Sequence, residues 1–287
     1  MRLSVIIPCL NEAEWIAMQL EALAAQQWPE PWEVIVSDNG STDASRQIAE
    51  RYATALPKLQ VVDASDRKGQ AHAKNVGARA AAGTAIVFCD ADDEVAPGWV
   101  AAMGEALSHH DFVASRFEIE KLNPAWVRAG RGTPQRDGVM KHWYPPFLPH
   151  AGGCGLGVRR ALHEAVGGFD ERWPVHEDTD YCFRIQLAGT PLMFAPDAVV
   201  HVRFQRTLSG VYRQASSWGK YNVLLYKTYR PLGMPKLSWK EGVFGWIGLV
   251  QTLPRVRSKD NYAAWLWQFG WRSGRLRGCL KYRVLAL

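Results

Sequence analysis

The sequence predicts an α/β protein in which a mixed, mostly parallel sheet is flanked by helices and followed by a C-terminal helical extension. Three observations support this fold class. Short apolar runs alternate with helical stretches over the first 90 residues, at the spacing of βαβ units. Polar residues directly follow several of these runs. The chain from residue 206 onward is basic, rich in tryptophan and helical in its spacing.

The N-terminal third alternates strand and helix in a regular order. Asn11 is a good N-cap for the first helix, and Glu14 completes a pattern that resembles a capping box. The alanine-rich third helix is expected to stop at Gly83. The expected strands are 3–8, 32–38, 59–64 and 85–90, and the expected helices are 11–27, 43–54 and 69–82.

The chain changes character after about residue 115. Residues 115–150 contain five prolines and are expected to be irregular, and a glycine-rich segment follows them. A helix is expected from Glu177 to about Ala188, and a bent strand or strand pair over 192–204. Two further helices are expected in the tail, over 209–230 and 261–285.

The bulk composition is that of a globular protein. The chain has 287 residues, 47% hydrophobic and 22% charged, enough for one large domain or two closely packed ones. The start "MRLSVIIPCLNEAEW" does not read as a secretory signal, and "VFGWIGLV" is much shorter than the roughly 20 residues of a membrane span. The five cysteines are scattered without a CxxC spacing, so reduced thiols and a cytosolic chain are expected.

The charge is distributed unevenly. The stretch from Arg206 onward has 15 Lys and Arg against two acids and holds six of the 13 tryptophans, whereas the first 205 residues hold 19 basic and 26 acidic residues. Such asymmetry suggests a polyanionic surface as partner. Trp and Tyr mixed with Lys and Arg favour peripheral attachment to the inner face of an anionic cell membrane. The alternative is a helical cap that packs its aromatic residues on the rest of the protein.

Polar residues gather at the expected C-terminal ends of strands, which is where open α/β sheets bind ligands. Asn11, Asp38 and the acidic turn that contains Asp90 and Asp92 all lie at such ends. Two carboxylates two residues apart can bind Mg²⁺ or Mn²⁺ together with a diphosphate. The alternative is a solvated acidic turn. Neither GxGxxG nor GxxxxGK[ST] occurs in the sequence.

A second acidic pair opens the expected helix at residue 177. A carboxylate there is stabilised by the positive end of the helix dipole, and an ionised Asp178 can take a proton from an attacking hydroxyl. The alternative is an ordinary helix start, and Asp180 fits that alternative because it lies four residues before Arg184. His201 is a candidate ligand for a metal or diphosphate, although a lone histidine in a strand is more often structural.

Seven segments in order resemble the family-2 glycosyltransferases of the GT-A (Rossmann-like) fold, over roughly residues 3–205. They are "SVIIPCLNE", "VIVSDNGSTDAS", "DRKGQAHAKNVGARAAAG", "IVFCDADD", "GGCGLGVRRALHEAVGGFDE", "HEDTDYCFRIQLAG" and "VVHVRF". The resemblance implies donor-binding roles for Pro8, Asn11, Glu12, Asp38, Asp66, Lys74, Asp90 and Asp92, a divalent metal (Mn²⁺ or Mg²⁺) at Asp92 with Asp90 and His201, and a catalytic base at Asp178.

The resemblance also implies how the chain is organised. Residues 1–100 are expected to bind the nucleotide sugar, 101–205 to hold the acceptor and the catalytic base, and 206–287 to form the basic extension. The acceptor side is expected to include Trp143, Tyr144, Gly153, Trp173 and Glu177. Flat aromatic faces could stack on a sugar ring, and core packing is the equal alternative for each of them.

The expected reaction is inverting transfer of a sugar from a nucleoside-diphosphate sugar (UDP, GDP or dTDP) to a hydroxyl of a glycan, polysaccharide or glycolipid precursor. A single in-line displacement needs one base and charge neutralisation on the leaving diphosphate. The alternatives are a nucleotidyltransferase, which would usually carry a glycine-rich basic loop after the first strand, and a non-catalytic nucleotide- or carbohydrate-binding module. A nucleic-acid partner is not expected, because it would not explain the acidic strand ends.

Overall fold

The computed structural model describes residues 2–128 and 130–286. The chain divides into two compact units, each of which is described by itself. The first comprises residues 1–118, 135–140 and 149–202, and the second comprises 119–134, 141–148 and 203–287. The predicted division by ligand role, at residues 100 and 205, stays a prediction.

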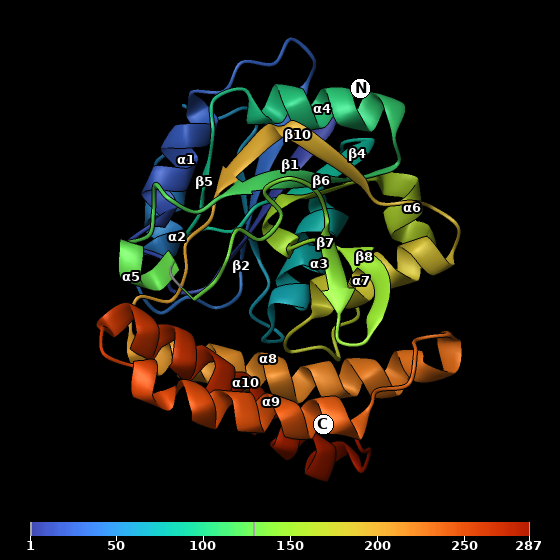
Figure 1. Ribbon diagram of the computed structural model, residues 1–287. Coiled ribbons are helices and arrows are strands. Elements are labelled where there is room, and N and C mark those ends of the chain that lie inside the picture. Colours follow the sequence, from blue (N-terminus) through green and yellow to red (C-terminus); the bar gives the residue numbers. More distant parts are fainter. Residues whose placement is uncertain (1, 129, 287) are drawn as a thin grey trace. The chain divides into compact units, whose positions relative to one another are not determined.

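The first unit is built on an eight-stranded sheet with the order β3-β2-β1-β4-β9-β6-β10-β5. The first four strands in that order run parallel, β9 is antiparallel to β4 and β6, and β10 is parallel to β6. The predicted mixed, mostly parallel sheet is therefore confirmed (Figure 1). The strands are β1 Leu3–Cys9, β2 Trp32–Asp38, β3 Gln60–Asp63, β4 Ala85–Phe88, β5 Glu94–Val95, β6 Phe112–Glu118, β9 Leu156–Arg159 and β10 Met193–His201, with β7 Met140–Trp143 and β8 Pro146–His150 in a separate two-stranded sheet.

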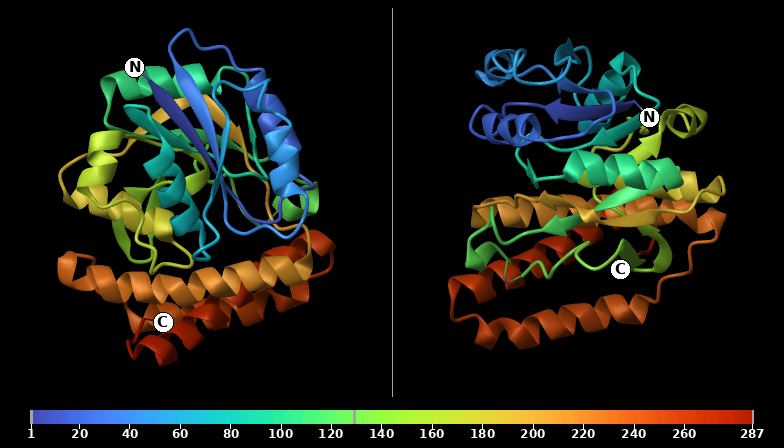
Figure 2. Two further views of the ribbon diagram at one scale, coloured as in Figure 1. Left: turned by 180° about the vertical axis from the view of Figure 1, so that it is seen from behind. Right: turned by 90° about the horizontal axis from the view of Figure 1, so that it is seen from above.

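Helices flank this sheet. Helices α1 and α2 contact each other, and α3 packs on β1 and β2 (Figure 2). Every residue of β1 and of β2 is buried, as expected for parallel strands that are covered on both faces. The helices of this unit are α1 Ile16–Ala24, α2 Ser45–Glu50, α3 Gln70–Ala80, α4 Trp99–His109, α6 Arg160–Ala165 and α7 Glu177–Leu187, with a short 3₁₀ turn η1 at Gly153–Gly155.

The core of the first unit joins residues from both halves of the sheet. Phe88 at the end of β4 packs edge-on against Phe169, with ring centroids 5.1 Å apart, and Phe169 stacks on Tyr181 of α7 at 4.2 Å. This aromatic cluster attaches α7 to the sheet. It thereby fixes the first turn of α7, where the predicted catalytic pair lies.

Two expectations about local structure were wrong. Asn11 does not cap a helix, because α1 begins at Ile16 and Asn11 adopts a left-handed conformation (φ 57°) in which its side chain accepts a hydrogen bond from the Thr42 backbone N–H. Part of the segment expected to be irregular is strand: β6 extends to Glu118, and β7 and β8 lie within 140–150. The expected pair of Asp180 and Arg184 is confirmed at 2.8 Å.

The second unit consists mainly of helices. Helices α8 and α10 lie side by side and approach so closely that a Cβ on Gly219 would collide with the backbone of Trp271, and one on Gly274 with that of Ser216. Within the described residues, no helix is both long enough and apolar enough to cross a membrane. The helices are α5 Ala125–Arg128, α8 Leu208–Tyr229, α9 Trp239–Thr252 and α10 Lys259–Tyr282, with 3₁₀ turns η2 Arg230–Leu232 and η3 Leu253–Arg255.

The stability of the first unit is expected to fall as the pH drops from about 6.5 to about 4. His163 is 6% exposed, its ring lies 2.8 Å from the Tyr181 hydroxyl, and burial, followed by Arg160 and Arg184, lowers its pKa to about 4. The unfolded chain then binds a proton that the folded chain does not, so acid favours unfolding, by about 3 kcal/mol over this interval. Urea denaturation at a series of pH values measures the loss.

The matched variant for this prediction is His163→Gln, which keeps a polar group of similar length and removes the titration. Carboxylates also titrate in acid, so the comparison of slopes is what isolates the histidine. The variant should show a shallower loss of unfolding free energy between pH 6.5 and 4. An equal slope in both proteins would show that His163 is not the group responsible.

Candidate functional site

A cavity of about 350 Å³ lies at the C-terminal ends of the parallel strands of the first unit. The ends of β1, β2 and β4 all contribute to it, so the structure brings together the strand ends that the sequence singled out. The lining residues are Pro8, Cys9, Leu10, Glu12, Asn39, Gly69, Gln70, Ala73, Asp90, Ala91 and Asp92.

Four of the predicted donor-binding residues line this cavity: Pro8, Glu12, Asp90 and Asp92. The other four lie outside its lining. Asn11 is exposed after β1 and accepts a hydrogen bond from the Thr42 N–H. Asp38 is buried, with its Oδ1 accepting a hydrogen bond from the Ser41 N–H. Asp66 is exposed and lies 2.9 Å from the His72 ring, and Lys74 is fully buried in an ion pair with Glu177. The donor-binding roles of all eight stay predictions.

Sequence reasoning missed two polar contributors to the cavity, Asn39 and Gln70. Asn39 donates hydrogen bonds to the carbonyls of Ala64 and Arg67 and accepts one from the Gly69 N–H, so it holds the loop before α3 in place. Gln70 donates to Asp90 Oδ1 at 3.0 Å. The signal for Asn39 was its position directly after Asp38 at a strand end, whereas nothing local in the sequence marks Gln70.

The carboxyl group of Asp90 lies in an unusually negative environment. Burial raises the pKa of Asp90, Lys74 lowers it, and the carboxylates of Asp92, Glu177 and Asp178 raise it, with a net pKa of about 6. Burial alone would lower the pKa of Lys74, but Glu177, at 3.1 Å, and then Asp90 and Asp178 raise it above its usual value. The site therefore has more negative charge than this lysine balances.

Asp178 is held in a fixed orientation at the start of α7. Its Oδ2 accepts a hydrogen bond from the Gly153 N–H at 3.0 Å, and its Oδ1 accepts from the N–H and hydroxyl of Thr179. A Cβ at residue 153 would meet the Lys74 ammonium, so a larger residue there would displace this lysine from its place in the site. An ionised carboxylate offers about four lone-pair positions, so Asp178 keeps capacity to accept a proton.

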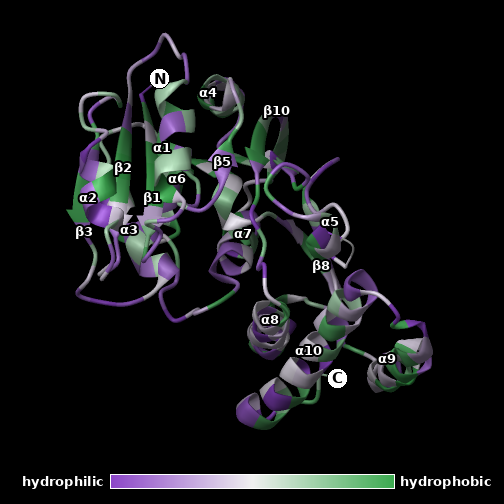
Figure 3. Cartoon of the chain, turned by 90° about the vertical axis from the view of Figure 1, so that its left-hand side faces the viewer, coloured by the Kyte–Doolittle hydropathy of each residue, from purple (hydrophilic) through white to green (hydrophobic). Residues whose placement is uncertain are grey.

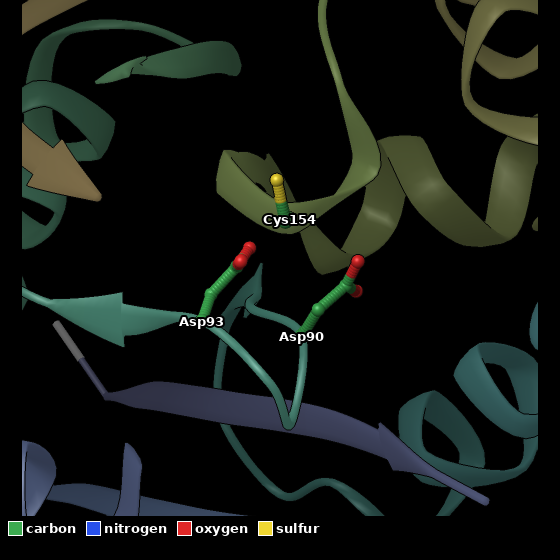
Figure 4. A group of neighbouring side chains, drawn as sticks. All are labelled: Asp90, Asp93 and Cys154. Atoms are coloured by element: carbon green, nitrogen blue, oxygen red, sulfur yellow. The ribbon is translucent and has the colours of Figure 1, made fainter. Parts of the chain in front are cut away.

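The donor atoms present at this edge fit a divalent cation. Asp90, Asp93 and Cys154 place one ligand atom each within 4.8 Å of one another, and Figure 4 shows the three neighbouring side chains. The two carboxylates of this set and the surplus of carboxylate charge around them suit Mg²⁺ or Mn²⁺, whereas the buried thiol is a poor ligand for either. Asp92, the predicted direct ligand, is not in this group of three, so its metal role stays a prediction.

His201, at the C-terminal end of β10, is also outside that group. Its Nδ1 lies 2.5 Å from the Glu118 carboxylate on the neighbouring strand β6. A carboxylate on one ring nitrogen is the usual way to orient a histidine whose other nitrogen binds a metal. Sequence reasoning missed Glu118, because only the pairing of β6 with β10 brings it to His201.

The predicted acceptor residues differ in their surroundings. Trp173 is 6% exposed, which favours the core-packing alternative for its ring. Trp143 and Tyr144 belong to the second unit, where Trp143 is 68% exposed and stacks on Trp271 at 6.4 Å. Their acceptor roles, like those of Gly153 and Glu177, stay predictions.

Two family models match the chain. The one described as Glycosyl transferase family 2 matches residues 4–167, more than half of the chain. A second, described as Glycosyl transferase family group 2, matches residues 139–279.

Curated relatives cover a large part of the chain at low identity. The glycosyltransferase AglE of Haloferax volcanii is 29% identical over 202 residues, which are 68% of this chain and 65% of that protein. The succinoglycan biosynthesis protein ExoA of Rhizobium meliloti is 29% identical over 200 residues, 64% of this chain and 58% of ExoA. The chain thus spans less than two thirds of the length of these relatives.

Solved structures share the fold. The mannosyltransferase PcManGT from Pyrobaculum calidifontis, in complex with GDP-Man and Mn²⁺, aligns with a TM-score of 0.64 at 21% identity and covers 100% of this chain and 76% of its own. Residues 1–349 of S. aureus TarS with UDP-GlcNAc align with a TM-score of 0.57 at 18% identity, covering 99% and 93%. The expected GT-A fold is thereby confirmed, and with the extent of the first family match it follows that this chain belongs to glycosyl transferase family 2.

Proposed function

We propose that this protein is an inverting, metal-dependent glycosyltransferase that moves a sugar from a nucleoside-diphosphate sugar to a hydroxyl acceptor. The observation that carries the proposal is the strand-end cavity lined by Asp90 and Asp92, in which the Asp90 carboxylate interacts electrostatically with Asp178 on α7. The family match favours sugar transfer over nucleotidyl transfer and over binding without catalysis.

Different residues of the site would have different roles in a single displacement reaction. Pro8, Glu12 and Asn39 line the part of the cavity formed by β1 and β2, where the nucleotide would bind. Asp178, fixed by the Gly153 and Thr179 N–H groups, would take the proton from the attacking hydroxyl. Lys74 offsets part of the carboxylate charge and holds Glu177 in place beside that base.

Asp90, Asp92 and His201 would hold the divalent cation, which, when bound, supplies positive charge to the leaving diphosphate. Mn²⁺ accompanies GDP-Man in the PcManGT structure, and UDP-GlcNAc is bound in the TarS structure. These two neighbours motivate GDP and UDP as the first nucleotides to test here. The acceptor we propose is a hydroxyl of a glycan, polysaccharide or glycolipid precursor, consistent with the name of ExoA.

Isothermal titration with UDP, GDP and dTDP, each with and without Mn²⁺, tests this function. One nucleoside diphosphate should bind more tightly than the others and should bind more tightly with the metal than without it. The matching nucleotide sugar should then release its sugar to a hydroxyl acceptor. Absence of binding by all three nucleotides under both conditions would contradict the proposal.

A further inference from the structure

Helix α9 exposes a broad apolar face. Its exposed hydrophobic side chains recur at helical spacing along its length and continue into η3. Their exposed fractions are 58% for Trp239, 41% for Val243, 67% for Phe244, 46% for Ile247, 66% for Val250 and 53% for Leu253. Helices of soluble proteins normally turn such a face inward, so this one requires an explanation.

The opposite side of α9 attaches the helix to α10. Leu249 is buried, and its carbonyl accepts a hydrogen bond from the Trp265 indole at 3.0 Å. Gly245 lies close to the Arg272 guanidinium. The helix is therefore fixed by one edge, with its apolar face directed away from that edge, and Figure 3 shows the hydrophobic colouring along α9.

Basic residues flank this face at both ends. Lys236 and Lys240 lie at its start, Arg255, Arg257 and Lys259 follow its end, and all five are exposed. Glu241 is the sole acid in residues 231–259. An apolar stripe with cationic ends complements a surface that is apolar inside and anionic outside, as an anionic bilayer is.

The other tryptophans of the extension contact aromatic rings within the second unit. Trp218 packs edge-on against Trp267 at 5.4 Å, and Trp265 stacks on Phe269 at 5.2 Å. Trp271 stacks on Trp143. The sequence predicted that the extension with its six tryptophans attaches to a membrane. The structure favours one part of it, helix α9, which the sequence indicated only as an apolar stretch too short to span a bilayer.

We propose that the apolar face of α9 is a docking surface for an anionic lipid bilayer, with the helix lying in the plane of the interface. A second copy of the chain fits less well, because pairing two such faces would bring their flanking basic residues together. The proposed lipid binding does not depend on the proposed sugar transfer, because it is inferred from α9 and not from the strand-end cavity. A membrane-bound enzyme would be placed to act on lipid-linked acceptors.

Co-sedimentation of the full-length protein with liposomes tests the proposal. Vesicles of phosphatidylcholine with phosphatidylglycerol should pellet the protein, and vesicles of phosphatidylcholine alone should bind it at least about tenfold less. Raising the salt from about 0.1 M to about 1 M shortens the Debye length from about 10 Å to about 3 Å, so it should weaken binding without abolishing it. Protein that stays in the supernatant with anionic vesicles at low salt would overturn the proposal.

Paired variants assign the binding to α9. Phe244→Gln with Ile247→Gln removes two exposed apolar side chains at little cost to folding, and we expect anionic-vesicle binding to fall at least about tenfold. Leu280→Gln is the matched control, since Leu280 is 81% exposed on α10, and its binding should be unchanged. Equal binding by wild type and the α9 variant would overturn the proposal, as would a wild-type dimer that the α9 variant converts to monomer. Donor affinity, measured in parallel, should not change in either variant.

Discussion

Replacing Asp178 by Asn is expected to slow sugar transfer by about 10²–10⁴-fold while leaving donor affinity nearly intact. The substitution keeps the size of the side chain and one acceptor oxygen for the Gly153 or Thr179 N–H, but it removes the group that can take a proton. Steady-state kcat/KM for transfer, together with the Kd of the donor from titration, measures the two effects separately.

Asp180→Asn is the matched control because Asp180 lies on the same helix, two residues on, and pairs with Arg184 rather than facing the site. It should lower stability and reduce transfer by less than tenfold. If Asp178→Asn retained near-wild-type transfer, the base would lie elsewhere. Glu177→Gln would then be the next variant. That substitution also removes the carboxylate that pairs with the buried Lys74 ammonium, so a loss of stability is expected with it.

The strands and helices that the sequence predicted well are those whose pattern is local. β1, β2 and β4 are predominantly apolar runs, and β1 and β2 are confirmed as buried over their full length. α7 begins at Glu177, as expected from the acidic first turn. Local sequence was sufficient for these segments because the hydrophobic periodicity and the residues that begin or end each element lie within the segment itself.

What could not be predicted depends on contacts between distant segments. β9 follows a glycine-rich turn and is inserted antiparallel between β4 and β6, a pairing that no local pattern encodes. Asn11 has the residue type of a cap, but the hydrogen bond with Thr42 determines its conformation instead. The apolar stretch in α9 is shorter than a membrane span, and the sequence alone does not show which side of this helix packs on α10.

For the candidate site too, contacts between distant segments could not be predicted from the sequence. Three strand ends were expected to meet, and the cavity has them as walls because parallel strands end at one edge. The sequence does not reveal that Glu177 and Asp178, almost 90 residues after Asp90, contribute to the environment that raises its pKa. Nor does it reveal that Asp93 and Cys154 lie close to Asp90, since only the approach of the η1 turn brings the thiol there.

Replacing Asp92 by Ala is expected to abolish the Mn²⁺-dependent part of nucleoside-diphosphate binding, a loss of at least about tenfold in affinity, or about 1.4 kcal/mol. The protein should still fold, because Asp92 lies half-buried on a turn at the cavity edge and supports little of the core. Titration with and without Mn²⁺ measures the loss, and thermal melting checks the fold. EDTA should lower donor binding by the wild type to the level of the variant.

The neighbouring cluster supplies the comparison that decides where the cation binds. Cys154→Ala should leave the Mn²⁺ dependence unchanged, because Mn²⁺ prefers oxygen ligands to a thiolate, and burial raises the pKa of this thiol so that it stays protonated. Asp93→Asn tests the buried carboxylate of the same cluster. If metal dependence survived in Asp92→Ala but disappeared in Asp93→Asn with the fold intact, the cation would belong to Asp90 and Asp93. Asp92 would then be a cavity residue whose charge adds to the field around Asp90 without contacting the metal.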